Sequence, residues 1–141
     1  MDLNGQEILK SIPDRISSHE QILTFIGQHE IKSNHISLIK SLTGFNNTII
    51  CSWFKINEST YRKYVASNIE IDEVLQEEII SVLILMKHGI GYFGTMEKFK
   101  AWLSSENFYL DWKQPLSILN TLEGKRFIAN MLTGMEYGDY V

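Results

Sequence analysis

The sequence predicts an all-α protein, because apolar residues recur at helical spacing and capping residues precede the apolar segments. Several segments repeat an apolar side chain every three to four residues, the period of a helix with one buried face. Asn57 and Thr121 stand immediately before two of these segments and are of a type that caps helices. Strand patterns that alternate with helices do not occur, so no parallel sheet is predicted.

Length and composition set limits on the function. The chain has 141 residues, of which 44% are hydrophobic, enough for one domain with a substantial core. Two small helical subdomains that share one core are equally compatible with these values. The formal net charge of -4 argues against a protein that is basic throughout, so contact with nucleic acid would require a local basic patch. No secretory signal or membrane-length apolar run is found, and we expect a soluble, cytoplasmic protein without membrane contact.

The cysteine and histidine content argues against a metal site. Cys51 is the single cysteine, which excludes an intrachain disulfide and a cysteine-rich zinc site. We interpret it as a small core residue; a nucleophilic thiol is the alternative, but no neighbouring base can be identified. The four histidines are scattered, so no metal ligand set is predicted.

The chain divides into four regions. Residues 1–33 are a helical arm, 34–68 a helix-turn-helix region, 69–91 a linking helix, and 92–141 a small helical C-terminal region. In the arm, a weak helix ends before Pro13. A second helix follows a capping box formed by Ser17 and Glu20 and continues to about Gln28.

Two short helices joined by a tight turn are typical of a helix-turn-helix. After a helix over 36–42 that Gly44 ends, Asn47 or Thr48 opens a helix, the turn covers 55–57, and Asn57 caps a helix over 58–65. Cys51 would lie where the two helices meet, with Ile56 and Tyr61 filling the core between them. The last helix is the expected reading helix, with these candidate DNA-binding residues: Ser59, Thr60, Tyr61, Arg62 and Lys63. Residues 32–68 contain five basic residues and one acidic residue, a net charge of 5 - 1 = +4.

The linking helix leads into a glycine pattern with two interpretations. Its apolar positions widen to nearly the whole circumference, so its second half should be buried, and Gly89 is expected to end it. Residues 89–94 spell G-x-G-x-x-G, which also occurs in dinucleotide-binding sites. The preceding segment has helical rather than strand character, which favours the helix end. We therefore predict no cofactor and no enzymatic activity.

The C-terminal region should contain three helices, with an irregular aromatic loop after the first of them. Thr95 caps a helix that buries Phe99 and Leu103, and Thr121 caps a final helix with apolar positions as far as Met135. The segment over 104–113 has no sustained period but is rich in aromatic residues. Pro115 suits the first position of a helix.

The order of these elements resembles the toxin-binding domain of Xre/MbcA/ParS-type antitoxins. The matching positions are Phe93, Gly94, Trp102, Leu103, Asn107, Leu110, Pro115, Leu116, Leu119, Thr121, Gly124, Leu132, Glu136, Tyr137 and Gly138. The family tends to have a proline before the asparagine and a Gly-Gly pair after the leucine, whereas this chain has Glu106 and Asp111-Trp112. The segment 59–62 also resembles the start of the recognition helix of these antitoxins.

The resemblance implies an antitoxin of a type II toxin–antitoxin system. Such a protein would bind a RES-domain toxin, an enzyme that consumes NAD, by covering its active site. Members of the family also tend to dimerise and to repress their own operon through the helix-turn-helix. A stand-alone DNA-binding regulator without a toxin partner is the alternative.

The C-terminal end suggests how a toxin would be bound. The candidate contacts are Trp102, Trp112, Glu136, Tyr137, Gly138, Asp139, Tyr140 and Val141. Acidic and aromatic groups suit a cleft that accepts the phosphates and rings of NAD. A glycine in this segment lets the backbone turn at low steric cost. In the alternative, the two tyrosines pack the final helix against its own core.

Overall fold

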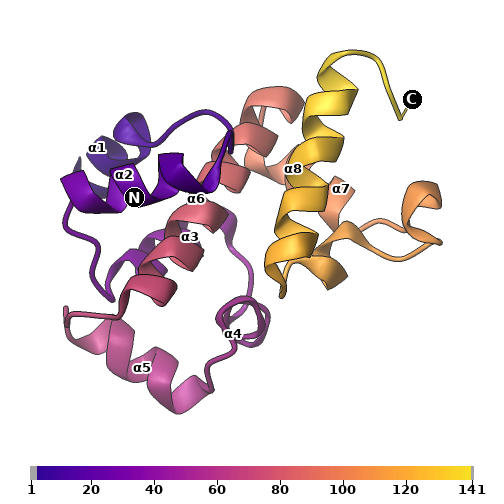
Figure 1. The fold of residues 1–141 in the computed structure, drawn as a ribbon. Helices are drawn as coiled ribbons and strands as arrows, with labels where there is room; N and C mark the ends of the chain where they lie inside the picture. The colour runs from indigo at the N-terminus through magenta and orange to yellow at the C-terminus, as the bar shows by residue number, and fades with distance from the viewer. Residues whose placement is uncertain (1–2, 141) are drawn as a thin grey trace.

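The computed structural model describes residues 3–140, and the regular secondary structure of this part of the chain is helical (Figure 1). It contains eight α-helices, two short 3-10 helices and two isolated β-bridges. The all-α prediction is confirmed. The α-helices are α1 (Leu3–Ser11), α2 (His19–Gln28), α3 (His35–Thr43), α4 (Asn47–Phe54), α5 (Glu58–Ala66), α6 (Glu73–Phe93), α7 (Met96–Leu103) and α8 (Leu122–Glu136). The 3-10 helices are η1 (Phe108–Leu110) and η2 (Pro115–Ile118).

Helix α6 is the central element. Every side chain from Ile79 to Met86 is at most 2% exposed. A helix that is buried on all sides needs neighbours on all sides, and α2, α3, α4, α7 and α8 all pack against it. In Figure 1 the helices of the N-terminal part lie on one side of α6, and α7 and α8 lie on the other. Both parts of the chain therefore share one core.

Helix α6 continues past the residue at which the sequence predicted its end. Gly89 lies inside the helix, which ends at Phe93 with Gly94 (φ +94°) as its C-cap. A Cβ atom at Gly89 would come within 2.1 Å of the Phe99 ring, so the glycine permits α7 to pack closely against α6. The prediction was wrong because a glycine that helix packing requires looks the same in the sequence as one that ends a helix. The G-x-G-x-x-G segment is thus mostly helix and forms no phosphate-binding loop.

The helix caps agree with the sequence closely, with shifts of one residue. Asn57 accepts a hydrogen bond from the Thr60 amide at 2.8 Å, and Gly44 (φ +69°) ends α3, as predicted. Helix α4 is capped by Asn46 rather than by Asn47 or Thr48. Helix α2 is capped by Ser18 rather than Ser17, and the Ser17 amide donates to the Gln21 side chain at 3.0 Å.

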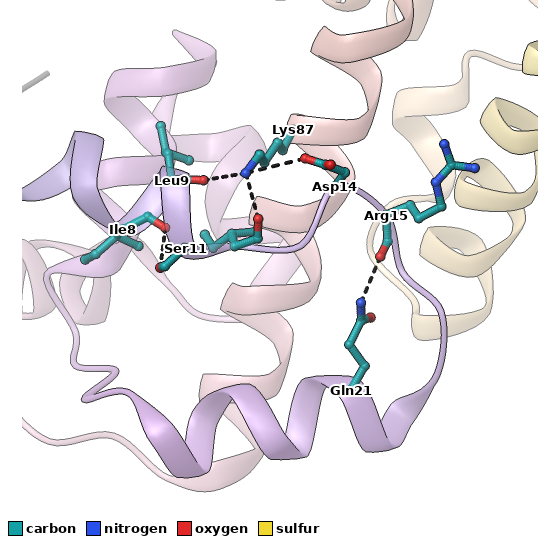
Figure 2. Close-up of polar contacts among 8 residues, drawn as sticks. Ile8, Leu9, Ser11, Asp14, Arg15, Gln21 and Lys87 are labelled. Carbon is teal, nitrogen blue, oxygen red and sulfur yellow. Dashed lines mark hydrogen bonds and ion pairs between the residues drawn. The ribbon is translucent and has the colours of Figure 1, made fainter.

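The α2 cap shows why such a shift arises. Ser17 with Glu20 and Ser18 with Gln21 both fit the capping-box pattern, in which a serine and an acidic or amide side chain three residues later bond reciprocally. The sequence therefore offers two equivalent registers. In the structure the glutamine register is used, because Gln21 also donates to the Arg15 carbonyl at 3.1 Å and so holds the preceding segment (Figure 2).

The end of α1 is fixed to α6 by the ammonium group of Lys87 (Figure 2). Lys87 donates hydrogen bonds to the carbonyls of Leu9 and Ile12, each at 2.7 Å, and lies 3.5 Å from the Asp14 carboxylate. Carbonyls at the end of a helix have no partner within the helix, and a cation there is favourable. Lys87, which belongs to α6, thus supplies hydrogen-bond donors to the carbonyl groups at the C-terminal end of α1.

Within residues 3–140, no single helix is long and apolar enough to cross a membrane. Helices α6 and α7 would reach the required length and composition only as a pair, and they are bent by 105° relative to each other.

The two glycines of α6 should respond oppositely to alanine. Gly89→Ala should lower the free energy of unfolding by about 1–3 kcal/mol, because the new methyl group overlaps the buried Phe99 ring. Gly91→Ala meets no atom within 4 Å and should raise it by about 0.5–1 kcal/mol, since alanine favours the helix. Urea denaturation of both variants checks this. Equal effects would contradict the packing described for Gly89.

Candidate partner-binding surface

Helices α7 and α8 form a rigid frame on α6. Phe99, Leu103, Ile128 and Leu132 are completely buried between these helices and the core. Thr121 accepts a hydrogen bond from the Gly124 amide at 2.9 Å and begins α8, as predicted. A Cβ atom at Gly124 would lie 1.6 Å from the Ile118 carbonyl oxygen, so the start of α8 packs on η2 backbone to backbone. The loop between α7 and α8 is therefore held at both ends.

One residue, Asn107, organises that loop through its backbone and its side chain. The Asn107 amide donates to the Lys113 carbonyl at 3.0 Å and closes the loop. Its own carbonyl accepts from the amides of Leu110 (3.0 Å) and Trp112 (2.8 Å), and its side-chain oxygen accepts from the Tyr109 amide at 2.9 Å. Asparagine is suited to this role, because its short polar side chain can bond the backbone two residues ahead.

The loop contains two consecutive non-glycine residues in the left-handed region. Asp111 has a φ of +54° and Trp112 a φ of +66°. These are the positions at which the chain departs from the Gly-Gly pair of the resembled family, and they adopt a conformation that glycine adopts freely. Trp112 is 61% exposed. An exposed tryptophan therefore stands where the backbone is strained.

Exposed aromatic rings gather around this tryptophan. We define the aromatic patch as Phe108, Tyr109, Trp112 and Tyr140, which are all exposed. Phe108 makes edge contacts with Tyr109 and Trp112 at ring-centroid distances of 5.3 and 5.6 Å, and Tyr109 contacts Tyr140 at 4.9 Å. A contiguous exposed aromatic surface on a rigid frame is typical of an interaction site.

The C-terminal segment turns back onto the end of α8. Gly138 has a φ of +90°, and the Asp139 amide donates to the Gly134 carbonyl at 2.9 Å. Tyr140 packs over Gly134, where a Cβ atom would lie 2.7 Å from its ring, and so completes the aromatic patch. Tyr137 is the most exposed of the large apolar side chains, at 80%. Val141 lies outside the described residues.

Glu136 makes its contacts inside the chain. It accepts a hydrogen bond from Arg15 at 2.7 Å, and its other oxygen pairs with the buried His88 of α6. Burial raises the pKa of Glu136, but the hydrogen bonds from His88 and Arg15 outweigh this effect and hold the pKa below its usual value of 4.5. This carboxylate ties the end of α8 to α6 and to the N-terminal arm, and does not join the aromatic patch.

The other predicted contacts fall into two groups. Trp102 is half-buried, and its ring packs against Phe93 at 5.6 Å and Phe99 at 6.1 Å, so it belongs to the frame. Trp112, Tyr137, Asp139 and Tyr140 lie at the surface. The prediction did not include Phe108 and Tyr109 among the contacts. Their occurrence in a loop without helical period was the available signal, because such rings have no helix face that would bury them.

Helix α5, the predicted reading helix, carries two exposed cations. Ser59, Arg62 and Lys63 are exposed on α5, and the Arg62 guanidinium lies 3.9 Å from Glu58. Tyr61 is 5% exposed and fills the core, so its side chain is not on the same face. Burial raises the pKa of Tyr61, and Cys51 adds to the effect.

Cys51 lies where the sequence placed it. The thiol is buried, and burial raises its pKa, with a smaller effect from Glu58. A raised pKa disfavours the thiolate that a nucleophile requires. The position supports a packing role for this residue.

The Glu136 contacts predict a specific pH dependence. A carboxylate with a lowered pKa stabilises the fold above its unfolded pKa, and this contribution is lost as the pH falls through the folded value, below 4.5. Glu136→Gln should therefore lose less stability than the wild type between about pH 5 and about pH 3. Thermal melts across this range provide the measurement. Glu106→Gln, which removes an exposed carboxylate elsewhere, is the control, and the same loss in both variants would contradict the role of Glu136.

The comparisons with known proteins concern the same surface. No curated protein shows significant similarity to the chain. The model of one family, the antitoxin Xre/MbcA/ParS C-terminal toxin-binding domain, matches residues 89–138. This range contains the last turn of α6, the frame of α7 and α8 and most of the aromatic patch. Residues 89–138 are thus similar to the toxin-binding domain of Xre/MbcA/ParS antitoxins, as the resemblance predicted.

Proposed function

We propose that the chain is the antitoxin of a type II toxin–antitoxin system and that it inhibits a RES-domain toxin, an enzyme that consumes NAD. The family match supports a toxin as the partner. The observation that carries the proposed site is the strained, exposed Trp112 at the centre of the aromatic patch. In this proposal the protein acts in the cytoplasm and has no catalytic activity of its own.

The strain at Trp112 supports a role in binding. A left-handed conformation costs a non-glycine residue roughly 1–2 kcal/mol. An exposed ring gains little burial energy within its own chain, so folding alone does not explain a tryptophan at this position. Burial of such a ring in a pocket of a partner is among the most favourable contacts at protein interfaces. The strain is consistent with a residue that is retained for its partner.

The adjoining tail supports a toxin that binds NAD. Tyr137 and Asp139 are exposed beside the patch, and together they present aromatic surface and negative charge. A cleft that accepts the phosphates and rings of NAD must offer positive charge and apolar walls. The tail would therefore complement that cleft, and it would cover the cleft while the aromatic patch holds the rim.

Trp112→Gly separates binding from folding. The variant should be as stable as the wild type or more stable, because glycine relieves the backbone strain. It should bind the toxin at least about tenfold more weakly, the loss typical of an interface hot spot. Calorimetric titration with the toxin and a thermal melt measure the two effects, and an NAD-consumption assay reports inhibition.

Phe127→Ala is the matched control, because Phe127 is an exposed aromatic side chain of α8 outside the aromatic patch. It should leave the affinity for the toxin unchanged. Full affinity in Trp112→Gly, or an equal loss in both variants, would contradict the proposed binding surface.

A second proposed function is repression of the antitoxin's own operon. It is supported by the α4–turn–α5 arrangement and by the exposed Arg62 and Lys63 on α5. Because two cations make few phosphate contacts, useful affinity would require a homodimer on two half-sites or the assembled toxin complex. The alternative is a stand-alone regulator, which would bind DNA but no toxin.

The double variant Arg62→Ala and Lys63→Ala should abolish retardation of promoter DNA and leave toxin inhibition intact. Both side chains are exposed and lie on the opposite part of the chain from the aromatic patch, so their removal should not affect the fold of residues 89–138. Electrophoretic mobility shifts at several salt concentrations provide the measurement. Unchanged retardation would place the DNA-binding surface elsewhere.

A further inference from the structure

A cavity lies where the N-terminal and C-terminal parts of the chain meet. Its volume is about 570 Å³, within the range of small-molecule sites. Its walls come from α2 and the segment before it, α6, the start of α8 and the turn between α4 and α5. None of its lining residues belongs to the aromatic patch. The cavity is therefore separate from the surface proposed to bind the toxin.

A buried lysine lines this cavity. Lys125 of α8 is 2% exposed. An ammonium group has three hydrogens to donate, yet the single hydrogen bond found for it within residues 3–140 is a long one, 3.4 Å, to the Trp53 carbonyl. A buried charge is costly unless hydrogen bonds and counter-charges compensate it. Lys125 thus has unused donor capacity at the wall of a cavity.

The surrounding charges favour an anion. Lys55 and Arg126 also line the cavity. Glu77, on the opposite wall, is already paired with His19 at 2.9 Å. Glu78 is half-buried, and burial raises its pKa although Lys125 and Lys55 act in the other direction. The three cations that line the cavity thus outnumber its two carboxylates.

Two further features of the cavity suit an organic molecule. The cavity includes the N-terminus of α8, where the amides of Leu122 and Glu123 have no acceptor within the helix and the helix dipole favours negative charge. The apolar side chains of Val74 and Leu122 also line it, and they are 63% and 54% exposed. An apolar body would cover these side chains and gain from their burial.

We propose that this cavity binds a small organic anion, in which a carboxylate or phosphate group reaches Lys125 and an apolar body covers Val74 and Leu122. The ligand would contact both parts of the chain at once, since Lys125 and Leu122 belong to the toxin-binding domain, whereas Val74 and Lys55 belong to the preceding part. This site goes beyond toxin inhibition and does not depend on it.

Titration of the isotope-labelled chain with benzoate, acetate and inorganic phosphate tests the proposal by NMR. The ionic strength is held constant with chloride. Benzoate should cause saturable shifts of the amides of 121–126 and of the Val74 and Leu122 methyl groups. Acetate carries a carboxylate without the ring of benzoate, and inorganic phosphate has no apolar part. Comparison with benzoate therefore separates the contribution of the apolar body to the affinity from that of the anionic group. Absence of saturable shifts with all three anions would overturn the proposal.

Three variants assign the effect to the cavity. Lys125→Met should abolish the saturable shifts, whereas Lys98→Met, on the exposed face of α7, should leave them unchanged. Should Lys125→Met fail to fold, Leu122→Glu tests the same point, because an exposed position at the cavity accepts a charge and the new carboxylate repels the anion. Shifts that persist in the folded Lys125→Met or Leu122→Glu chain would overturn the proposed site.

Discussion

The burial of the middle of α6, from Ile79 to Met86, is the constraint on which the rest of the structure depends. A helix that is apolar around its whole circumference cannot lie at a surface, so both the N-terminal helices and the α7–α8 frame must cover it. The proposed DNA-binding and toxin-binding regions thus pack against the same helix, on different sides of it. A change in the packing of α6 would reach both, because packed cores respond to the loss or gain of a single methylene group.

This arrangement also explains how an irregular loop can present a defined surface. The aromatic patch lies on η1 and on the segments that follow η1 and α8, in connections of a kind that is usually mobile. Here Asn107 closes the loop, Tyr140 rests on Tyr109, and Glu136 fixes the end of α8 to His88 and Arg15. A binding surface held in this way loses less conformational entropy when a partner docks.

The sequence predicted the features that depend on local chemistry. Helical periodicity and the caps Asn57 and Thr121 were sufficient for the helices around them, because a cap acts within three residues of itself. The capping-box register at Ser17 and Ser18 was ambiguous, since two overlapping patterns satisfy the same rule. The all-α class followed from these local signals alone.

The features that were missed depend on contacts between distant residues. Gly89 remains in the helix because of Phe99, and Glu136 faces inward because of Arg15, which is 121 positions away in the chain. The glycine-like backbone of Trp112 was also invisible, because tryptophan seldom adopts it and the hydrogen bonds of Asn107 impose it. Such placements follow from packing that no local pattern encodes.

Hydrogen exchange on the chain, alone and bound to the proposed RES-domain toxin, tests the central claim most directly. Exchange reports which backbone segments a partner covers, independently of any substitution. The account predicts that the toxin protects the loop over 107–113 and the segment over 134–140, while α5 exchanges at the same rate in both states. Protection confined to α5 or to the N-terminal arm, with no change in the loop, would contradict it.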